Sequence, residues 1–299
     1  MTTGGTLRSA MLCAALMLFI SSVSAKERDY RIVASFSILG SMVEAVAGDL
    51  AEIRTIVGPD TDAHVYQPSI ADARTVAQAD LVFVNGLGFE TWANTLISES
   101  GTEARVYVAT DGIVPLEVNG TIDPHAWNSL VNGMAYVRNI ASAMSESMPE
   151  HAEEFAARSE SYLSKLAELD RETRSRVAGL PANRRTVVTA HDAFGYLADA
   201  YGLEFLAPQG IDTDSEPSAR DLAALIDQLR DGGAAALFVE NISSPALVQQ
   251  ISNDTGIAIG GRLFSDALSE RGGPATSYLA MFRHNLNALL SALEQPKRL

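Results

Sequence analysis

Short apolar runs alternate with segments of helical spacing along residues 31–110 of the chain. Apolar runs bounded by turn residues are typical of buried strands, whereas apolar positions three and four residues apart indicate amphipathic helices. Repeated alternation of the two predicts a parallel sheet covered by helices. The predicted strands are 31–36, 51–57, 81–84 and 105–109, and the predicted helices are one that ends at residue 47, 70–78 and 90–98.

Residues 186–290 repeat this pattern and predict a second α/β unit. One of its helices has Pro245 in the first turn and Gly256 just beyond the end, which are favoured residues at those two positions. The dipeptide Gly260-Gly261 leads out of the last apolar run. The predicted strands are 186–190, 204–207, 235–239 and 257–259, and the predicted helices are 194–201, 219–230, 245–255 and 277–293.

The segment between the two units, residues 130–177, is helical in composition, with one break expected near Pro149. Residues 149–177 predict one helix of about 28 residues, or about 42 Å at 1.5 Å per residue. Its apolar positions do not keep a heptad, so we interpret it as a connector rather than as a coiled coil. The prediction is an α/β fold of two lobes, 26–129 and 181–299, each with a parallel sheet flanked by helices, joined by one long backbone helix within a linking region at 130–180.

The first 25 residues have the features of a secretory signal peptide. Arg8 provides a short basic start, residues 11–20 form an apolar run, and Val23-Ser24-Ala25 is a small-residue cleavage site. The run is too short to span a membrane. Cys13 follows Leu12 inside this run and not a small residue at a cleavage point, so we expect a free periplasmic protein and not a lipid-anchored one.

Composition narrows the chemistry that the exported chain can perform. Cys13 is the only cysteine, and its removal with the signal leaves no disulfide and no thiolate ligand. The signal contains one arginine and no acidic residue, so the formal charge changes from −15 to −16 on cleavage. A chain with this much negative charge is not expected to bind nucleic acid or anionic lipid. Any metal site must therefore use imidazole and carboxylate.

Four residues far apart in the sequence have the character of metal ligands. Three of the five histidines, together with one aspartate, lie in turn-like segments at or beyond the end of a predicted strand. Ligands of open α/β sheets gather outside the carboxyl ends of the strands, so two facing lobes would bring the four side chains into one cleft. Three imidazoles and a carboxylate suit a divalent transition metal. The predicted ligands are His64, His125, His191 and Asp266.

Each of these residues also has a structural interpretation. A single histidine is more often a hydrogen-bonded or surface residue, and His151 and His284, which lie mid-helix among polar residues, are interpreted in that way. Asp266 could cap a helix that begins at residue 267, and Asp192 is interpreted as a cap. It is the joint pattern that favours a metal site.

Three acidic residues are candidates to hold the second ring nitrogen of a ligand histidine, because metal-bound histidines usually donate that N–H to a carboxylate or carbonyl. They could equally be turn or cap residues. They are Asp62, Asp123 and Glu240.

Enzymatic function is not expected. A catalytic zinc site keeps an open fourth position, which Asp266 would fill here. The sequence contains no His-Glu-x-x-His motif, no Gly-x-Ser-x-Gly motif and no glycine loop for phosphate. A metal-independent adhesin or structural protein is the remaining alternative.

Several segments resemble the ligand segments of the zinc and manganese solute-binding proteins of ABC transporters. They are 58–68, 85–90, 123–127, 189–196 and the segment around Asp266. The resemblance covers nearly the whole mature chain, and it implies two lobes joined by a long helix, with His64, His125, His191 and Asp266 as ligands. It also implies a receptor that delivers its metal to an inner-membrane ABC permease served by a cytoplasmic ATPase.

Two features of the sequence bear on which metal is bound, and they point in different directions. Manganese-type members of that family tend to have glutamate where this chain has His191. Many zinc-type members carry a long loop rich in His and Asp before the second ligand, in the region that is short and free of histidine here, 114–123. Three imidazoles with one carboxylate suit four-coordinate Zn²⁺, although a bidentate Asp266 could serve Mn²⁺ or Fe²⁺. We predict a monomeric zinc receptor, with a manganese (or iron) receptor as the alternative. The sequence leaves open whether a periplasmic metallochaperone loads it.

Overall fold

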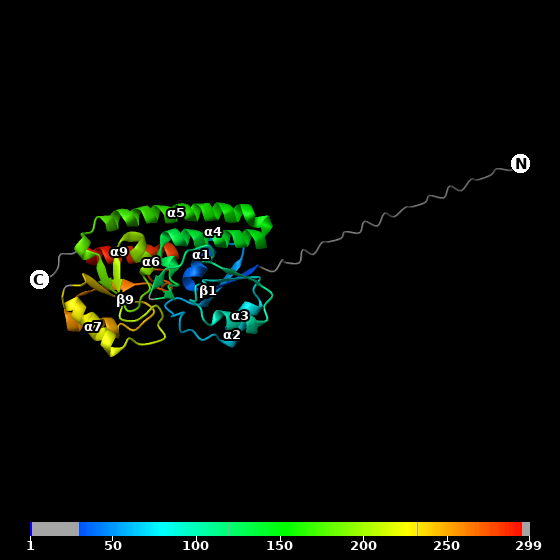
Figure 1. Cartoon of the computed structure of the whole chain (residues 1–299). Helices are drawn as coiled ribbons and strands as arrows, with labels where there is room; N and C mark the ends of the chain where they lie inside the picture. The colour runs from blue at the N-terminus through cyan, green and yellow to red at the C-terminus, as the bar shows by residue number, and fades with distance from the viewer. Residues whose placement is uncertain (2–29, 119, 232, 295–299) are drawn as a thin grey trace.

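The computed structural model describes residues 30–118, 120–231 and 233–294, together with Met1. Apart from Met1, the predicted signal peptide at 1–25 lies outside the described residues. Two α/β lobes lie side by side beneath a long helix, as Figure 1 shows. The prediction of two parallel sheets flanked by helices and joined by a long helix is confirmed.

The first lobe contains a four-stranded parallel sheet in the order β2-β1-β3-β4. The central strand β1 is buried at every position after Arg31, because it is apolar on both faces and helices cover the sheet. Ile32 pairs with Ile53 on one side and with Leu81 on the other. The strands are β1 (Arg31–Phe36), β2 (Glu52–Val57), β3 (Leu81–Val84) and β4 (Arg105–Val108), and the helices are α1 (Ser37–Ala47), α2 (Ile70–Ala77) and α3 (Ala93–Ser100).

The second lobe has a parallel sheet in the order β10-β9-β7-β8. In chain order this is the same arrangement as in the first lobe: the first strand lies between the second and the third, and the fourth is at the edge. The strands are β7 (Thr186–Val188), β8 (Glu204–Leu206), β9 (Ala236–Glu240) and β10 (Ile259–Leu263), and the helices are α6 (Gly195–Tyr201), α7 (Ala219–Arg230), α8 (Ala246–Thr255) and α9 (Tyr278–Leu293).

The last strand differs from its prediction. The sequence predicts a strand at 257–259 that gives way to Gly260-Gly261, whereas β10 begins at Ile259 and runs through both glycines. A Cβ atom at Gly260 would collide with Ala292 of α9 and with the ring of Phe238 in β9, so the glycine permits close packing of both against β10. The register with β9 shifts between Ile259 and Gly261, an irregularity of strand pairing that apolar alternation does not reveal.

The connector consists of α4 (Leu130–Ser147), a 3₁₀ turn η2 (Pro149–His151) and α5 (Ala152–Ala178). Figure 1 shows α5 running across the top of both lobes, with α4 beneath it over the first lobe. The 27 residues of α5 correspond to about 40 Å of helix. It buries one stripe of side chains at helical spacing, which includes Phe155, Tyr162, Leu166 and Leu169.

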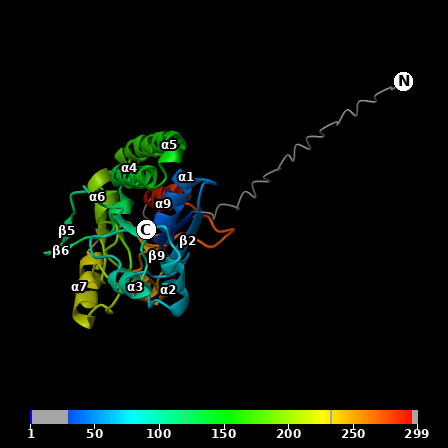
Figure 2. The same ribbon diagram turned by 90° about the vertical axis from the view of Figure 1, so that its right-hand side faces the viewer.

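The region between β4 and α4 is built from short elements that the sequence pattern did not predict. A two-stranded antiparallel hairpin, β5 (Glu117–Val118) and β6 (Thr121–Ile122), projects from the edge of the molecule in Figure 2. A 3₁₀ turn, η1 (Ala126–Asn128), follows it, and another, η3 (Ala182–Arg184), precedes β7.

Within the described part of the chain, no helix is long and apolar enough to cross a membrane.

The larger of two hydrophobic clusters spans both lobes and joins residues from both sheets and from the connector, whereas a smaller cluster lies within the second lobe. Trp127 lies fully buried at the junction, where its indole N–H donates to the carbonyl of Ser265 at 2.8 Å. Its own carbonyl accepts the hydroxyl of Tyr278 at 2.6 Å. The lobes are therefore fastened to each other beside the segments that follow β6 and β10.

Candidate metal centre

Four side chains from four separate segments converge between the lobes. His64 lies in the loop after β2, His125 immediately precedes η1, His191 follows β7 and Asp266 follows β10. One ligand atom from each residue lies within 4.8 Å of the others. The structure thus brings together the four residues that the sequence singled out; their role as ligands remains a prediction.

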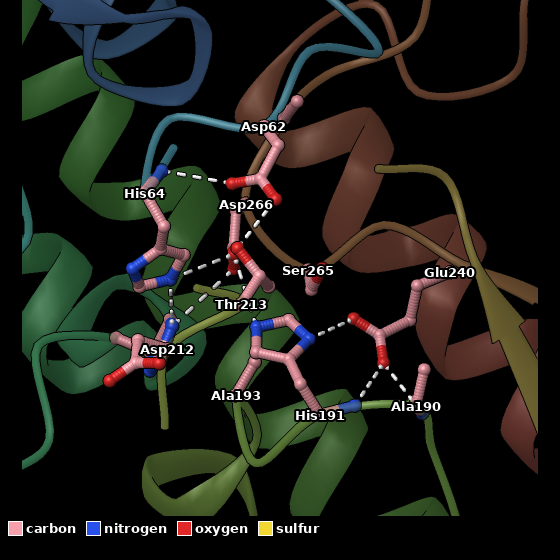
Figure 3. Close-up of polar contacts among 12 residues, drawn as sticks. Asp62, His64, Ala190, His191, Ala193, Asp212, Thr213, Glu240, Ser265 and Asp266 are labelled. Atoms are coloured by element: carbon pink, nitrogen blue, oxygen red, sulfur yellow. Dashed lines mark hydrogen bonds and ion pairs between the residues drawn. The ribbon is translucent and has the colours of Figure 1, made fainter. Parts of the chain in front are cut away.

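The Nε2 atoms of the three imidazoles face the carboxylate of Asp266. The distance from Asp266 Oδ2 is 3.3 Å to His64 Nε2 and 3.2 Å to His191 Nε2, and Oδ1 lies 3.7 Å from His125 Nε2. The Nε2 atoms of His64 and His125 are 3.1 Å apart. Figure 3 shows His64, His191 and Asp266 pointing toward one another.

The site is almost completely removed from solvent. His125, His191 and Asp266 are fully buried, and His64 retains 8% exposure. Both carboxylate oxygens of Asp266 are buried without a well-aligned hydrogen-bond donor among the described residues. Burying a carboxylate in this way is costly unless a cation balances it, so the geometry fits a bound metal ion.

Asp123 orients the ring of His125. Its Oδ1 atom lies 2.8 Å from His125 Nδ1 and also accepts the backbone N–H of His125 at 2.9 Å. A carboxylate at Nδ1 holds the proton there, so the neutral ring presents a lone pair at Nε2. Asp123 therefore acts as one of the predicted ring-holding carboxylates.

Glu240 performs the same task for His191 from a different strand. Its Oε2 lies 2.6 Å from His191 Nδ1, and its Oε1 accepts the backbone N–H groups of Ala190 and His191 at 2.8 and 3.0 Å. Figure 3 shows these contacts on the side of the ring away from Asp266. β7 and β9 are neighbours in the sheet, so their carboxyl ends bring His191 and Glu240 together.

Two groups of the site have displaced pKa values. Burial alone would lower the pKa of His191, but the carboxylates of Glu240 and Asp266 outweigh it and raise this pKa well above its usual range. Burial would raise the pKa of Asp266, whereas the imidazoles of His191 and His125 hold it well below its usual range. A cation would thus replace a proton at His191 and meet an ionised Asp266.

Asp62 does not contact the ring of His64. Its Oδ1 accepts the backbone N–H of His64 at 2.9 Å, and its Oδ2 accepts the hydroxyl of Thr213, from the second lobe, at 2.6 Å. The ring of His64 instead packs edge-on against Phe89, with 4.8 Å between centroids. Of the three candidate acids, two hold a ligand ring, and Asp62 holds the loop.

The segment 85–90, which resembles the family at sequence level, supports the His125 turn. The side-chain amide of Asn85 donates to the carbonyl of Pro124 at 3.0 Å, and Tyr136 donates to Asn85 Oδ1. The predicted helix at 90–98 starts later, at Ala93, because Glu90 turns inward to accept the hydroxyl of Ser35 and the backbone N–H of Asn85. Burial raises the pKa of this carboxyl.

The cap role predicted for Asp192 is wrong, and the structure also excludes the alternative cap role of Asp266. Helix α6 begins at Gly195 with Phe194 at its N-cap and without a side-chain cap bond, so Asp192 does not cap it. No helix follows Asp266 directly. His151 and His284 lie outside the cluster, as expected; His284 packs on Phe264 and lies 3.0 Å from the carbonyl of Arg262.

Three inward-facing imidazole nitrogens and one buried carboxylate could serve as four ligands for a divalent cation, with two of the residues in each lobe. Phe89 and Trp127 pack against the ring of His125 and keep the surroundings apolar. The fold and the site together define a class of protein: a two-lobed α/β protein that can enclose a metal ion between its lobes.

Known proteins agree with this class. Residues 32–292 match the family ZnuA, described as zinc-uptake complex component A, periplasmic, and the chain belongs to that family. It is a metal-binding receptor of the ABC-transporter type and not an enzyme.

Relatives and solved structures are similar over most of their length. The manganese-binding lipoprotein MntA of Halalkalibacterium halodurans is 33% identical over 89% of this chain and 89% of its own. The iron ABC transporter substrate-binding lipoprotein MtsA of Streptococcus pyogenes serotype M1 is 32% identical over 95% of this chain and 96% of its own. The periplasmic zinc binding protein TroA of Treponema pallidum has a TM-score of 0.85 and 30% identity, over 89% of this chain and 99% of its own.

Proposed function

We propose that this protein binds one Zn²⁺ ion through His64, His125, His191 and Asp266. The observation that carries the proposal is the convergence of these four buried side chains, with one ligand atom of each within 4.8 Å of the others. Asp123 and Glu240 hold two of the rings so that Nε2 is free for the metal. In this role the zinc ion is cargo that is bound and later released.

Zinc is favoured over manganese by the donor set. Three imidazoles and one carboxylate match four-coordinate Zn²⁺, whereas Mn²⁺ prefers more oxygen ligands and a higher coordination number. The fully buried His191 supplies nitrogen where an oxygen donor would favour manganese.

A manganese or iron receptor is the second candidate. The relatives MntA and MtsA are named for manganese and iron, and TroA is named for zinc. Asp266 could supply both oxygens to a larger coordination sphere. Overall similarity of about 30% to proteins of three metals does not choose among them.

We further propose that the loaded receptor works in the periplasm as a monomer and delivers zinc to an inner-membrane ABC permease. Two relatives are named lipoproteins, but Cys13 here lies inside an apolar run and follows Leu12, which favours a free protein. Mass spectrometry of the mature protein would detect a lipid on an N-terminal cysteine if the protein is anchored. Loading by a periplasmic metallochaperone is compatible with the proposal but is not required by it.

Elemental analysis of the protein purified from its native periplasm is the direct test of the metal. We expect about one zinc per chain, because the cluster has four ligands for one ion. Titration of the metal-free protein should then give tighter binding of Zn²⁺ than of Mn²⁺ at neutral pH. Native protein that carries manganese or iron, with little zinc, would favour the second candidate.

A further inference from the structure

Asp60 joins segments of both lobes beside the metal centre, although it contacts none of the four ligand side chains. It lies in the loop after β2, four residues before His64. Its φ of 48° places it in the left-handed region, where aspartate and asparagine are better tolerated than most residues. Residues of regular strands and right-handed helices do not adopt this conformation.

Three hydrogen bonds fasten Asp60 to the second lobe. Its backbone N–H donates to the carbonyl of Leu268 at 2.8 Å. Its carboxylate accepts the side-chain amide of Asn241 at Oδ1, at 2.9 Å, and the backbone N–H of Glu270 at Oδ2, at 3.1 Å. All of its polar groups except the carbonyl are thus engaged across the lobe junction.

The partners of Asp60 are neighbours of the groups that form the site. Leu268 lies two residues beyond Asp266, and its own N–H donates to Ser37 of the first lobe at 2.9 Å. Asn241 directly follows Glu240, which holds the ring of His191, and its amide also donates to the carbonyl of Ala267 at 3.2 Å. One exposed aspartate therefore connects the segments that carry His64, Asp266 and Glu240.

We propose that Asp60 is a positioning residue of the metal site, which sets the distance between the ligands of the first lobe and those of the second. The proposal rests on the proposed function, because it concerns the same four ligands. Asp60 is exposed, so its removal opens no cavity in the core. Its loss should therefore weaken metal binding more than it weakens folding.

The test compares the zinc affinity of variants of the purified protein by competition with a chromogenic chelator. We expect Asp60→Ala to weaken zinc binding about tenfold, at the lower end of the loss found for residues that orient metal ligands. Asp60→Asn should lose less, since the amide keeps one acceptor and tolerates the left-handed conformation. The melting temperature of the metal-free protein should change little in both.

Asp111→Ala is the matched control. Asp111 is an exposed aspartate of the same lobe, and its carboxylate has no hydrogen bond or ion pair within 30–118, 120–231 and 233–294. We expect its zinc affinity to equal that of the unmodified protein. A tenfold loss in this variant as well would mean that a general change of charge causes the effect, and would overturn the proposal.

A double-mutant cycle with Asp266→Ala tests positioning directly. Contacting or coupled residues give effects that do not add, so Asp60→Ala should cost clearly less when Asp266 is already absent. An equal loss in both backgrounds, or an affinity of Asp60→Ala within about twofold of the unmodified protein, would overturn the positioning role alone. If the unmodified protein does not bind zinc, the proposed function is overturned as well. The measurement on the unmodified protein alone therefore distinguishes that outcome from a failure of the Asp60 proposal.

Discussion

The two lobes have the same strand order, yet they support their histidines in different ways. Each lobe buries a glutamate beside the carboxyl ends of its first and third strands: Glu90 in the first lobe and Glu240 in the second. Glu240 contacts the ring of His191 directly, whereas Glu90 accepts hydrogen bonds from Ser35 and Asn85 and is linked to the His125 turn through Asn85. In the first lobe the ring is held locally, by Asp123 on the same turn.

The comparison shows two solutions to one requirement. A metal-bound histidine usually donates its second ring N–H to an acceptor. That acceptor comes from two residues away for His125 and from a neighbouring strand for His191. The local solution depends on one turn, whereas the other depends on the correct pairing of β7 with β9. We therefore expect the second-lobe ligands to be more sensitive to substitution than the first-lobe ligands.

Removal of a ligand ring should have the largest effect. His191→Ala deletes one nitrogen ligand and leaves Glu240 buried without the ring it contacts, so we expect zinc affinity to fall by at least about a hundredfold. His125→Ala should also weaken binding strongly, but by less, because Asp123 would keep its backbone bond at residue 125. Isothermal titration with competing chelator measures both. Equal affinity of His191→Ala and unmodified protein would refute the ligand assignment.

Replacement of the two carboxylates by amides should separate the lobes more clearly. Glu240 uses both oxygens to accept N–H groups, so Glu240→Gln must turn its NH₂ toward a donor, and we expect a loss of about thirtyfold in zinc affinity. Asp123 uses only Oδ1, and its Oδ2 is buried without a hydrogen-bond partner in the described structure. Asp123→Asn can therefore keep both bonds, and should lose no more than about threefold.

Asp123→Asn is thus the matched control for Glu240→Gln, since both changes replace a buried carboxylate by an amide of the same size. Chelator competition at one pH and ionic strength compares them. A similar loss in the two variants would mean that the charge of the carboxylate matters and not its hydrogen-bond geometry, and the contrast between the lobes would disappear.

The sequence predicts local contacts of the site better than contacts between strands or between lobes. The sequence indicates Asp123 as a ring-holding residue because it stands two residues before His125, and a turn fixes that spacing. Glu240 is a candidate from its place at a strand end, but its contact with His191 depends on strand order, which apolar periodicity does not determine. Asp60 and Thr213 gave no signal, since their bonds cross the lobe junction between residues 150 or more positions apart.

The dependence of zinc binding on pH should show the electrostatic side of the comparison. Burial would lower the pKa of His191, but Glu240 and Asp266 raise it, so this ring is protonated in the metal-free protein at pH values where an ordinary histidine is neutral. Zinc must displace that proton, so affinity should fall about tenfold for each unit by which the pH drops below the raised pKa. Glu240→Gln removes a cause of the rise, and its affinity should therefore depend less steeply on pH. Chelator competition between pH 6 and 8 measures both slopes, and parallel slopes would contradict this account.

The smallest effect is expected at Asp62, which lies in the ligand loop but contacts no ring. Asp62→Ala removes the acceptors for the backbone N–H of His64 and for the hydroxyl of Thr213, and leaves the packing of His64 on Phe89 in place. Because the loop keeps its other contacts, we expect zinc affinity to fall by only about threefold, below the roughly tenfold lower end of the loss found for residues that orient metal ligands. Asp123→Ala, measured beside it, should reach that tenfold. A loss in Asp62→Ala that equals or exceeds the loss in Asp123→Ala would contradict this expectation. It would mean that the hydrogen bond between Asp62 and Thr213 orders the site as much as a carboxylate on a ring does. The placement of His64 in the first lobe would then depend on the second lobe.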